Sequence, residues 1–210
     1  HWDTSLRDLG AEAILLALED ARIERPEALY VGNMLSGQLA QQENVGALIA
    51  DYAGLRGVEA LKVEAACASG AAALRMAYLA VAGGICDIVV ACGVEKMTEA
   101  TTDETTTALA SAADAVYESA HGLSFVALNA LLMQRYMHEY GYTHDDFGGF
   151  AITAHRNAIH NPYAMFQRSI TPEAFADAKM IAAPISLFDS SGIGDGAAAA
   201  LLCSEEFLRN

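Results

Sequence analysis

The sequence predicts a layered α/β fold, in which helices alternate with buried strands. Three observations support this class. Several segments place apolar residues at the 3.6-residue spacing of a helix. Short apolar runs separate them, and "DIVVACGV" at 87–94 is of the kind buried on both faces of a sheet. The links between these segments are short and contain glycine, which is typical of alternating α/β units.

The first half of the chain supplies most of this alternation. Asp3 or Thr4 is expected to cap a first helix that ends before Pro26. Its apolar stripe consists of Leu6, Leu9, Ala13, Leu16 and Ala17. The elements predicted next are a strand at 28–35, a helix at 41–55, a strand at 59–67, a helix at 68–82 and a strand at 87–94.

The composition changes after Met97. The Thr-rich stretch 98–114 lacks a clear period and is expected to be a loop. Helices are predicted near 122–140, at 143–160 with Thr143 as its cap, and near 173–179, followed by a buried strand at 195–206. We therefore expect a core domain of residues 1–97 and 181–210, interrupted by a mainly helical inserted domain at 98–180.

The charge balance excludes two classes of partner. Twelve basic residues against 27 acidic ones give a net charge of −15, which disfavours nucleic acid and anionic membrane surfaces. No apolar run reaches the roughly 18 to 20 residues that cross a bilayer. An anionic small molecule remains compatible with the sequence if a local pocket overrides the overall field.

The cysteines and histidines suggest neither disulfides nor a metal site. Free thiols are expected at the four cysteines, which favours a cytoplasmic location; they are Cys67, Cys86, Cys92 and Cys203. No set of histidines has metal-ligand spacing, so each is expected to be a polar surface group. The six are His1, His121, His138, His144, His155 and His160.

Cys67 lies where a predicted strand meets an Ala-rich helix, in "KVEAACASGAAALRMAYLAVAGG" at 62–84. A helix N-terminus carries partial positive charge, which stabilises a thiolate and makes it a better nucleophile. Small neighbours leave space for an acyl group, and the Cys67 backbone N–H is placed to donate to an oxyanion. A buried structural cysteine explains the same local features equally well.

The glycine pattern in "SSGIGDG" at 190–196 has a simpler interpretation than nucleotide binding. A dinucleotide fingerprint follows a strand and opens a helix. This pattern precedes a predicted strand, so a tight turn is favoured.

Four motifs in order along the chain resemble the thiolase family. "CASG" at 67–70 resembles the nucleophile turn of thiolases, and "GVEKM" at 93–97 resembles the G-x-E-x-M segment that follows it. The stretch from Arg135 to Ala164 is similar to the loop domain of sterol-carrier-protein-type and archaeal thiolases. "ISLFDSSGIGDGAAAALLCSE" at 185–205 resembles the strand that closes their first half. The match runs along nearly the whole chain.

This resemblance implies a fold, and it covers only one half of a thiolase. Thiolases consist of two similar halves in an α/β/α/β/α sandwich, with a loop domain inserted in the first half. The chain resembles the first α/β/α half. The catalytic histidine, second cysteine and Asn-Glu segment of the family belong to the second half and are not among these 210 residues. We therefore expect the chain to be part of a longer enzyme or to act with another chain, and to be inactive alone in the sense that it does not complete turnover.

The resemblance also implies site residues. Cys67 is the acyl-accepting nucleophile. His121 and Gly122 fall where the loop domain lines the acyl pocket, although Val126 and Ala127 stand where the family often has Glu-Asn. Support of the active site is implied for Ser69, Gly70, Glu95 and Met97.

The implied activity is that of an acyl-CoA C-acyltransferase, either condensing two acetyl-CoA or cleaving a 3-ketoacyl-CoA with CoA. Similarity to the archaeal type favours the synthetic direction. Coenzyme A thioesters are substrates, and no cofactor or metal is implied. Implied partners are a second copy of the chain in a homodimer or homotetramer, a hydroxymethylglutaryl-CoA synthase and a small acyl-CoA-binding protein. The alternatives are a related ketoacyl synthase or hydroxymethylglutaryl-CoA synthase, and a non-catalytic acyl-CoA-binding or scaffold subunit.

Overall fold

The structure of the chain is a computed structural model that describes residues 3–209. His1 of the sequence analysis lies outside the described residues. Two compact units are present. The first contains the described residues up to Ala108 together with those from Gly194, and the second is Leu109–Ile193. The expected domain boundaries at 97/98 and 180/181 stay a prediction.

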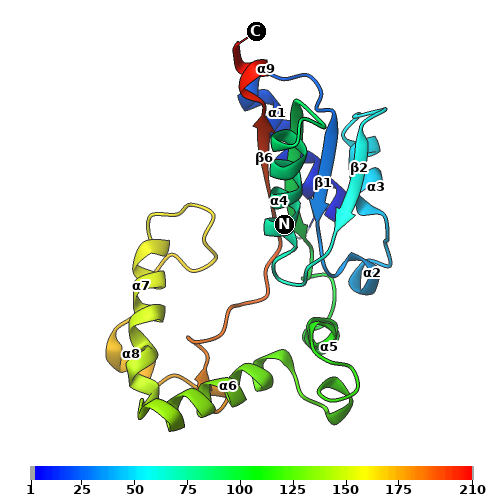
Figure 1. The fold of residues 1–210 in the computed structure, drawn as a ribbon. Helices are drawn as coiled ribbons and strands as arrows, with labels where there is room; N and C mark the ends of the chain where they lie inside the picture. The colour runs from blue at the N-terminus through cyan, green and yellow to red at the C-terminus, as the bar shows by residue number, and fades with distance from the viewer. Residues whose placement is uncertain (1–2, 210) are drawn as a thin grey trace. The chain divides into compact units, whose positions relative to one another are not determined.

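The first unit is built on a four-stranded sheet with the order β2-β1-β3-β6. Strands β1 (Ala28–Gly32), β2 (Glu59–Val63) and β3 (Ile88–Glu95) are parallel, and β6 (Gly196–Cys203) pairs antiparallel with β3. The three parallel strands therefore end at one edge of the sheet (Figure 1).

Helices cover both faces of this sheet, which gives three layers. α1 (Leu6–Ala21) and α3 (Val45–Tyr52) pack on one face, where Leu29, Val31 and Val90 are fully buried. On the other face α4 (Ser69–Ala82) packs through alanines against Tyr30 and Val89. The observed layers confirm the predicted α/β class. Three shorter helices complete the first unit: α2 (Ser36–Leu39), α5 (Thr102–Leu109) and α9 (Glu205–Arg209).

The second unit is mainly helical. Its elements are the 3₁₀ helices η1 (Ala110–Ala112), η2 (Ser119–His121) and η3 (His144–Phe147), the α-helices α6 (Phe125–Tyr140), α7 (Gly148–Ala158) and α8 (Pro172–Ala176), and the hairpin strands β4 (Met180–Ala182) and β5 (Ile185–Ser186). Its buried cluster consists of Ala151, Ile170 and Phe175.

Two expectations about local structure were wrong. The stretch 98–114 contains α5, because Thr101 and Glu104 form reciprocal hydrogen bonds that begin the helix, a pattern that the sequence T-x-x-E encodes. Ser5, neither Asp3 nor Thr4, caps α1, since its side chain accepts from the Asp8 N–H at 3.2 Å.

The apolar stripe of the first helix was also displaced. Leu16 is 57% exposed, whereas Ile14 and Leu18 face the sheet with Leu6 and Leu9. Ala-rich and Leu-rich sequence in this helix allows more than one stripe at helical spacing, and the sheet selects one of them.

Candidate active site

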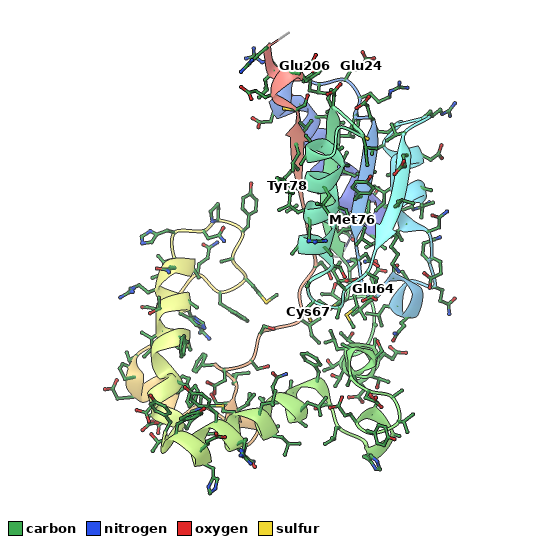
Figure 2. The ribbon with its side chains drawn as sticks, viewed as in Figure 1. Glu24, Glu64, Cys67, Met76, Tyr78 and Glu206 are labelled. Carbon is green, nitrogen blue, oxygen red and sulfur yellow. The ribbon has the colours of Figure 1, made fainter. Side chains whose placement is uncertain are left out.

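Cys67 lies on the turn between β2 and α4, at the edge of the sheet where the parallel strands end. The side chain is exposed, and Figure 2 shows it in the turn that leads into α4. The 14-residue helix begins two residues later at Ser69. A buried structural role, the alternative left open by the sequence, therefore does not describe this thiol.

The backbone of this turn is strained. Ala66 has φ of +49°, a left-handed conformation that costs a non-glycine residue roughly 1 to 2 kcal/mol. Ser69 supports it: its hydroxyl donates to the Ala66 carbonyl at 2.6 Å and accepts from the Ala65 N–H at 2.9 Å. The Ser69 side chain thus closes the turn that presents Cys67, and Ser69 itself is buried.

A glycine at the end of β1 lets the start of α4 come close to the sheet. A Cβ on Gly32, at the end of β1, would lie 2.3 Å from the Ser69 carbonyl oxygen. Gly70 faces Gly93 of β3, and a Cβ on Gly93 would be 3.4 Å from the Gly70 Cα. Close packing of this helix end against two strands holds the turn in place.

Glu95 ends β3 and binds the segment that follows β1. Its carboxylate accepts hydrogen bonds from the Asn33 side-chain amide at 2.9 Å and from the Met34 N–H at 3.0 Å. Burial raises the pKa of the Glu95 carboxyl, and these hydrogen bonds oppose that shift without cancelling it. The observed role of Glu95 is to fix a loop, with its carboxylate oxygens already engaged.

Met97 is held by an aspartate from the far end of the chain. Asp195 accepts from the Met97 N–H at 2.8 Å and forms a buried ion pair with Lys96 at 2.8 Å. Burial acts to raise the pKa of Asp195, but hydrogen bonds from Lys96, Thr98 and Met97 outweigh it and lower that pKa to about 2. The segment 190–196 leads into strand β6, as predicted, but residues 191–195 form no tight turn; its Asp195 joins the segment to the end of β3.

His121 and Gly122 belong to the second unit. His121 is the last residue of η2 and is exposed, and Gly122 follows with φ of +80°. Cys67, Ser69, Gly70, Glu95 and Met97 all belong to the first unit. These five residues lie around the ends of the parallel strands, whereas His121 and Gly122 lie in the second unit.

The expectation that every histidine is a surface group was wrong for His144. Its ring lies 2.8 Å from Asp189 through Nε2 and stacks on Phe175 with 4.6 Å between centroids. His155 is half-buried, with Nδ1 3.0 Å from the Arg168 carbonyl oxygen. Within residues 3–209, no group of three or more His, Cys, Asp or Glu side chains could hold a metal ion.

The other cysteines differ from Cys67. Cys92 is fully buried in β3, and burial raises the pKa of its thiol to about 12. Cys86 is half-buried, and burial, then Glu27 and Glu59, raise its thiol pKa. Cys203 is also half-buried, and all four cysteines are free thiols.

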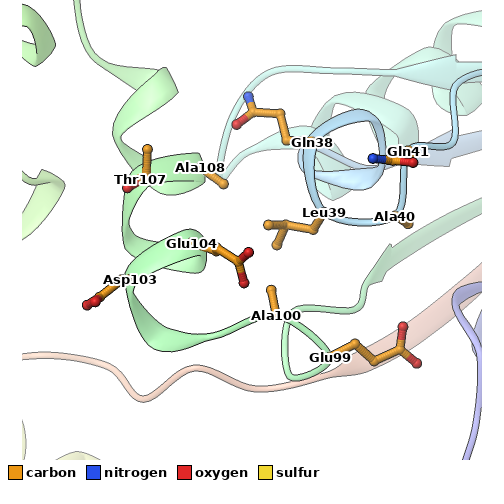
Figure 3. A pocket seen from close by; sticks show the side chains of 10 residues that line it. All are labelled: Gln38, Leu39, Ala40, Gln41, Glu99, Ala100, Asp103, Glu104, Thr107 and Ala108. Atoms are coloured by element: carbon orange, nitrogen blue, oxygen red, sulfur yellow. The ribbon is translucent and has the colours of Figure 1, made fainter.

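A groove of about 800 Å³ lies between α2 and α5 (Figure 3). Its lining includes Gln38, Gln41 and the carboxylates of Glu99, Asp103 and Glu104. Hydrogen bonds from Thr101 lower the pKa of Glu104, which keeps that group ionised. Three carboxylates repel the phosphates of a molecule such as coenzyme A, so this groove is unsuited to it.

Comparison with known families identifies the chain. Residues 1–183 match the family described as "Thiolase, N-terminal domain". The chain belongs to the thiolase family. The resemblance read from the four motifs is thereby confirmed.

Similarity to individual thiolases extends along the whole chain. The chain is 45% identical over 210 residues to the acetyl-CoA acetyltransferase of Methanothermobacter thermautotrophicus, and the match covers 99% of this chain and 54% of that protein. The acetyl-CoA acetyltransferase of Methanocaldococcus jannaschii is 42% identical over 207 residues, with 98% and 52% covered. The thiolase chain therefore spans about half the length of the curated relatives it matches.

A solved structure, the Ltp2-ChsH2(DUF35) aldolase, has a TM-score of 0.77 and 29% identity to this thiolase chain, covering 99% of it and 53% of the solved chain. The likeness confirms the predicted thiolase-like α/β fold. Among residues 3–209, none of the helices has the length and apolar character needed to cross a membrane.

Two residues that hold the strand ends at this site were not predicted from the sequence. Asn33 binds the ends of β2 and β3, and Asp195 binds the end of β3. No local signal identifies Asn33, since a single Asn after an apolar run is common in turns. Asp195 lies inside the motif at 185–205, but its partner Lys96 is 99 residues away in the sequence.

Proposed function

We propose that this thiolase chain carries the acyl-accepting part of an acyl-CoA C-acyltransferase, with Cys67 as the nucleophile. One observation carries the proposal: an exposed thiol on a strained turn, two residues before a 14-residue helix whose N-terminal end favours negative charge. The backbone strain at Ala66 is of the kind that concentrates at reactive groups.

The proposed first step involves only Cys67 and one acyl-CoA. The Cys67 thiolate attacks the thioester carbonyl of an acyl-CoA, a Cys67 Sγ–acyl bond forms, and the bond between the acyl carbon and the CoA sulfur breaks. The proton that leaves Cys67 ends on the CoA thiol. In synthesis, the α-carbon of a second acetyl-CoA loses a proton and bonds to the acyl carbon, the Cys67 Sγ–acyl bond breaks, and the Cys67 thiolate leaves. In cleavage, the Cys67 thiolate attacks the 3-keto carbon of a 3-ketoacyl-CoA, the bond between that carbon and the α-carbon breaks, and the α-carbon takes up a proton to leave as acetyl-CoA. Similarity to the archaeal acetyl-CoA acetyltransferases supports the synthetic direction.

The remaining site residues have proposed supporting roles. Ser69 and Gly70 hold the turn, Glu95 and Met97 hold the strand end beneath it, and the side chain of His121 with Gly122 lines the acyl pocket. Coenzyme A thioesters are substrates in this scheme, with no resident cofactor or metal.

Partners are proposed on the same basis. The Ltp2-ChsH2(DUF35) aldolase has two components in its name. That similarity supports a subunit partner for this chain, which we propose to be a small acyl-CoA-binding protein, with a hydroxymethylglutaryl-CoA synthase as a further partner. We also propose self-association as a homodimer or homotetramer and a cytoplasmic location.

Labelled acetyl-CoA tests the nucleophile directly. The chain should gain the mass of one acetyl group, mapped by peptide analysis to Cys67, and Cys67→Ser should gain none. Cys86→Ser is the matched control, since it removes a half-buried thiol and should leave the gain unchanged. A folded wild-type chain that takes no acetyl group favours the scaffold alternative, and acetylation that persists in Cys67→Ser contradicts the assignment.

A further inference from the structure

We propose that Asn33 is a positioning residue that sets the geometry of the Cys67 turn. The inference rests on the proposed function of Cys67 and extends it to a residue with no part in the chemistry. Asn33 follows the last residue of β1 and is 1% exposed. Its backbone N–H and both polar atoms of its side chain bind elements that converge on the edge of the sheet where Cys67 lies.

Asn33 connects the three parallel strands at their ends. Its backbone N–H donates to the Val63 carbonyl at the end of β2, at 3.1 Å. Its side-chain Nδ2 donates to the Val94 carbonyl and to Glu95 Oε1, both at 2.9 Å, at the end of β3. Its Oδ1 accepts from the Ser36 N–H at 3.0 Å. The buried side-chain amide thus links β3 and the start of α2 to the end of β1, and the backbone N–H of the same residue adds the link to β2.

Both ends of the Cys67 turn rest on Asn33 and its neighbour. The turn leaves β2 at Val63, which Asn33 binds, and enters α4 at Ser69, whose carbonyl oxygen would be 2.3 Å from a Cβ on Gly32. Gly32 and Asn33 are consecutive in the chain, so a shift of one moves the other. A displacement of Asn33 therefore changes the distance between the two ends of the turn that presents Cys67.

The chemistry of the Asn33 site requires an amide. Asn33 uses the side chain both as a donor, to Val94 and Glu95, and as an acceptor, from Ser36. Alanine would leave the buried Val94 carbonyl and the Ser36 N–H without these partners. Aspartate would preserve the acceptor but place a second carboxylate against Glu95.

The test compares rates of acetylation at Cys67 in the chain and in Asn33→Ala, measured as single-turnover mass gain over a range of acetyl-CoA concentrations. The rate at saturating acetyl-CoA should fall at least tenfold, whereas the half-saturating concentration should change less than twofold, because Asn33 orients the thiol and contacts no substrate. Asn129→Ala, an exposed amide in α6, should match wild type.

A pair of substitutions that exchanges the carboxylate and the amide between positions 33 and 95 separates positioning from a general loss of structure. Asn33→Asp should slow acetylation as Asn33→Ala does, and Asn33→Asp combined with Glu95→Gln should recover at least threefold, because the donor and acceptor between the two positions are exchanged. The pair also serves if Asn33→Ala does not fold. A folded Asn33 variant with the wild-type saturating rate overturns the proposal, as does a pair no faster than the Asn33→Asp variant alone.

Alkylation by iodoacetamide distinguishes this proposal from the proposed function. If wild type takes no acetyl group, the acyltransfer proposal has failed, yet positioning remains testable through the alkylation rate at Cys67. That rate should fall at least threefold in folded Asn33→Asp and stay unchanged in Asn129→Ala. Equal alkylation rates in all three proteins overturn the positioning role.

Discussion

In the first compact unit, hydrogen bonds between distant residues hold the strand ends, whereas short-range caps dominate the second. Asn33 reaches Val94 across 61 positions, and Lys96 reaches Asp195 across 99. Three helices of the second unit, α6, η3 and α8, begin after Ser124, Thr143 and Thr171, each bound to a residue three positions on. The first unit therefore provides the long-range geometry that a reacting atom needs.

The two units also differ in how many apolar side chains they bury. Buried residues fill both faces of the first unit's sheet. The second unit's buried cluster is Ala151, Ile170 and Phe175, while Tyr163 is 94% exposed and Phe150 is 78% exposed. Fewer buried apolar contacts indicate lower local stability, so the second unit should open more readily than the first.

The largest expected effect comes from breaking the buried ion pair of the first unit. Asp195→Ala leaves the Lys96 ammonium buried without this partner and should lower the free energy of unfolding by about 3 to 5 kcal/mol. Denaturant unfolding at neutral pH measures it. Glu99→Ala is the control: Glu99 is 60% exposed and 3.8 Å from the same ammonium, and its loss should cost under about 1 kcal/mol.

The pH dependence of Asp195 has a definite sign. Its folded pKa of about 2 lies below the ordinary value of 3.8, so the ionised group stabilises the fold above pH 3.8. That contribution should be lost as the pH falls towards 2, and Asp195→Asn should show a shallower loss of stability over this range. Equal acid sensitivity in the two proteins, or equal costs for Asp195→Ala and Glu99→Ala, contradicts the assignment.

A smaller effect is expected from a methyl group at the helix–sheet contact. Gly32→Ala forces a Cβ to within 2.3 Å of the Ser69 carbonyl oxygen and should destabilise the first unit by about 2 to 3 kcal/mol. In the second unit, a Cβ on Gly149 of α7 meets no atom within 4 Å. Gly149→Ala should therefore be neutral or stabilising by up to about 1 kcal/mol. Thermal unfolding compares the two, and a similar loss in both contradicts the contrast.

The smallest effect should be confined to the second unit. Asp189 accepts from the Ser186 N–H at 2.8 Å and its hydroxyl at 2.6 Å, and it pairs with His144. Asp189→Ala should cost about 1 to 2 kcal/mol of local stability. Amide hydrogen exchange should speed up in η3 and β5 and stay unchanged in β1 and β3.

Asp145→Ala provides the control for that exchange experiment. Asp145 is 77% exposed and 3.9 Å from the other ring nitrogen of His144. Its removal should leave exchange in β5 unchanged. Faster exchange in β1 or β3 of Asp189→Ala would show that the two units do not open independently.

Much of the fold was predictable because it depends on local periodicity. The strands at 28–32 and 88–95 and the helix at 69–82 lie within the ranges expected, or differ by one residue at an end. α5 was missed because threonine has low helix propensity, although the Thr101–Glu104 pair encodes its start.

The site was predictable only in part. Cys67 carries a local signal, since its motif joins a strand to an Ala-rich helix. Asn33 carries none, because its role comes from binding Val63 and Val94, which are 30 and 61 positions away. The prediction for His144 was wrong because the residues that bury it, Phe175 and Asp189, are far from it in the sequence.

By itself, the sequence determined the alternation of helices and strands, the position of Cys67 before a helix, and membership of the thiolase family. The tertiary structure decided that Cys67 is exposed and that Asn33, Glu95 and Asp195 hold the strand ends around it. The physical reason is the distance along the sequence over which each kind of interaction acts. Periodicity and turn propensity act over a few residues, whereas a hydrogen bond between chain segments exists only after the sheet has brought them together.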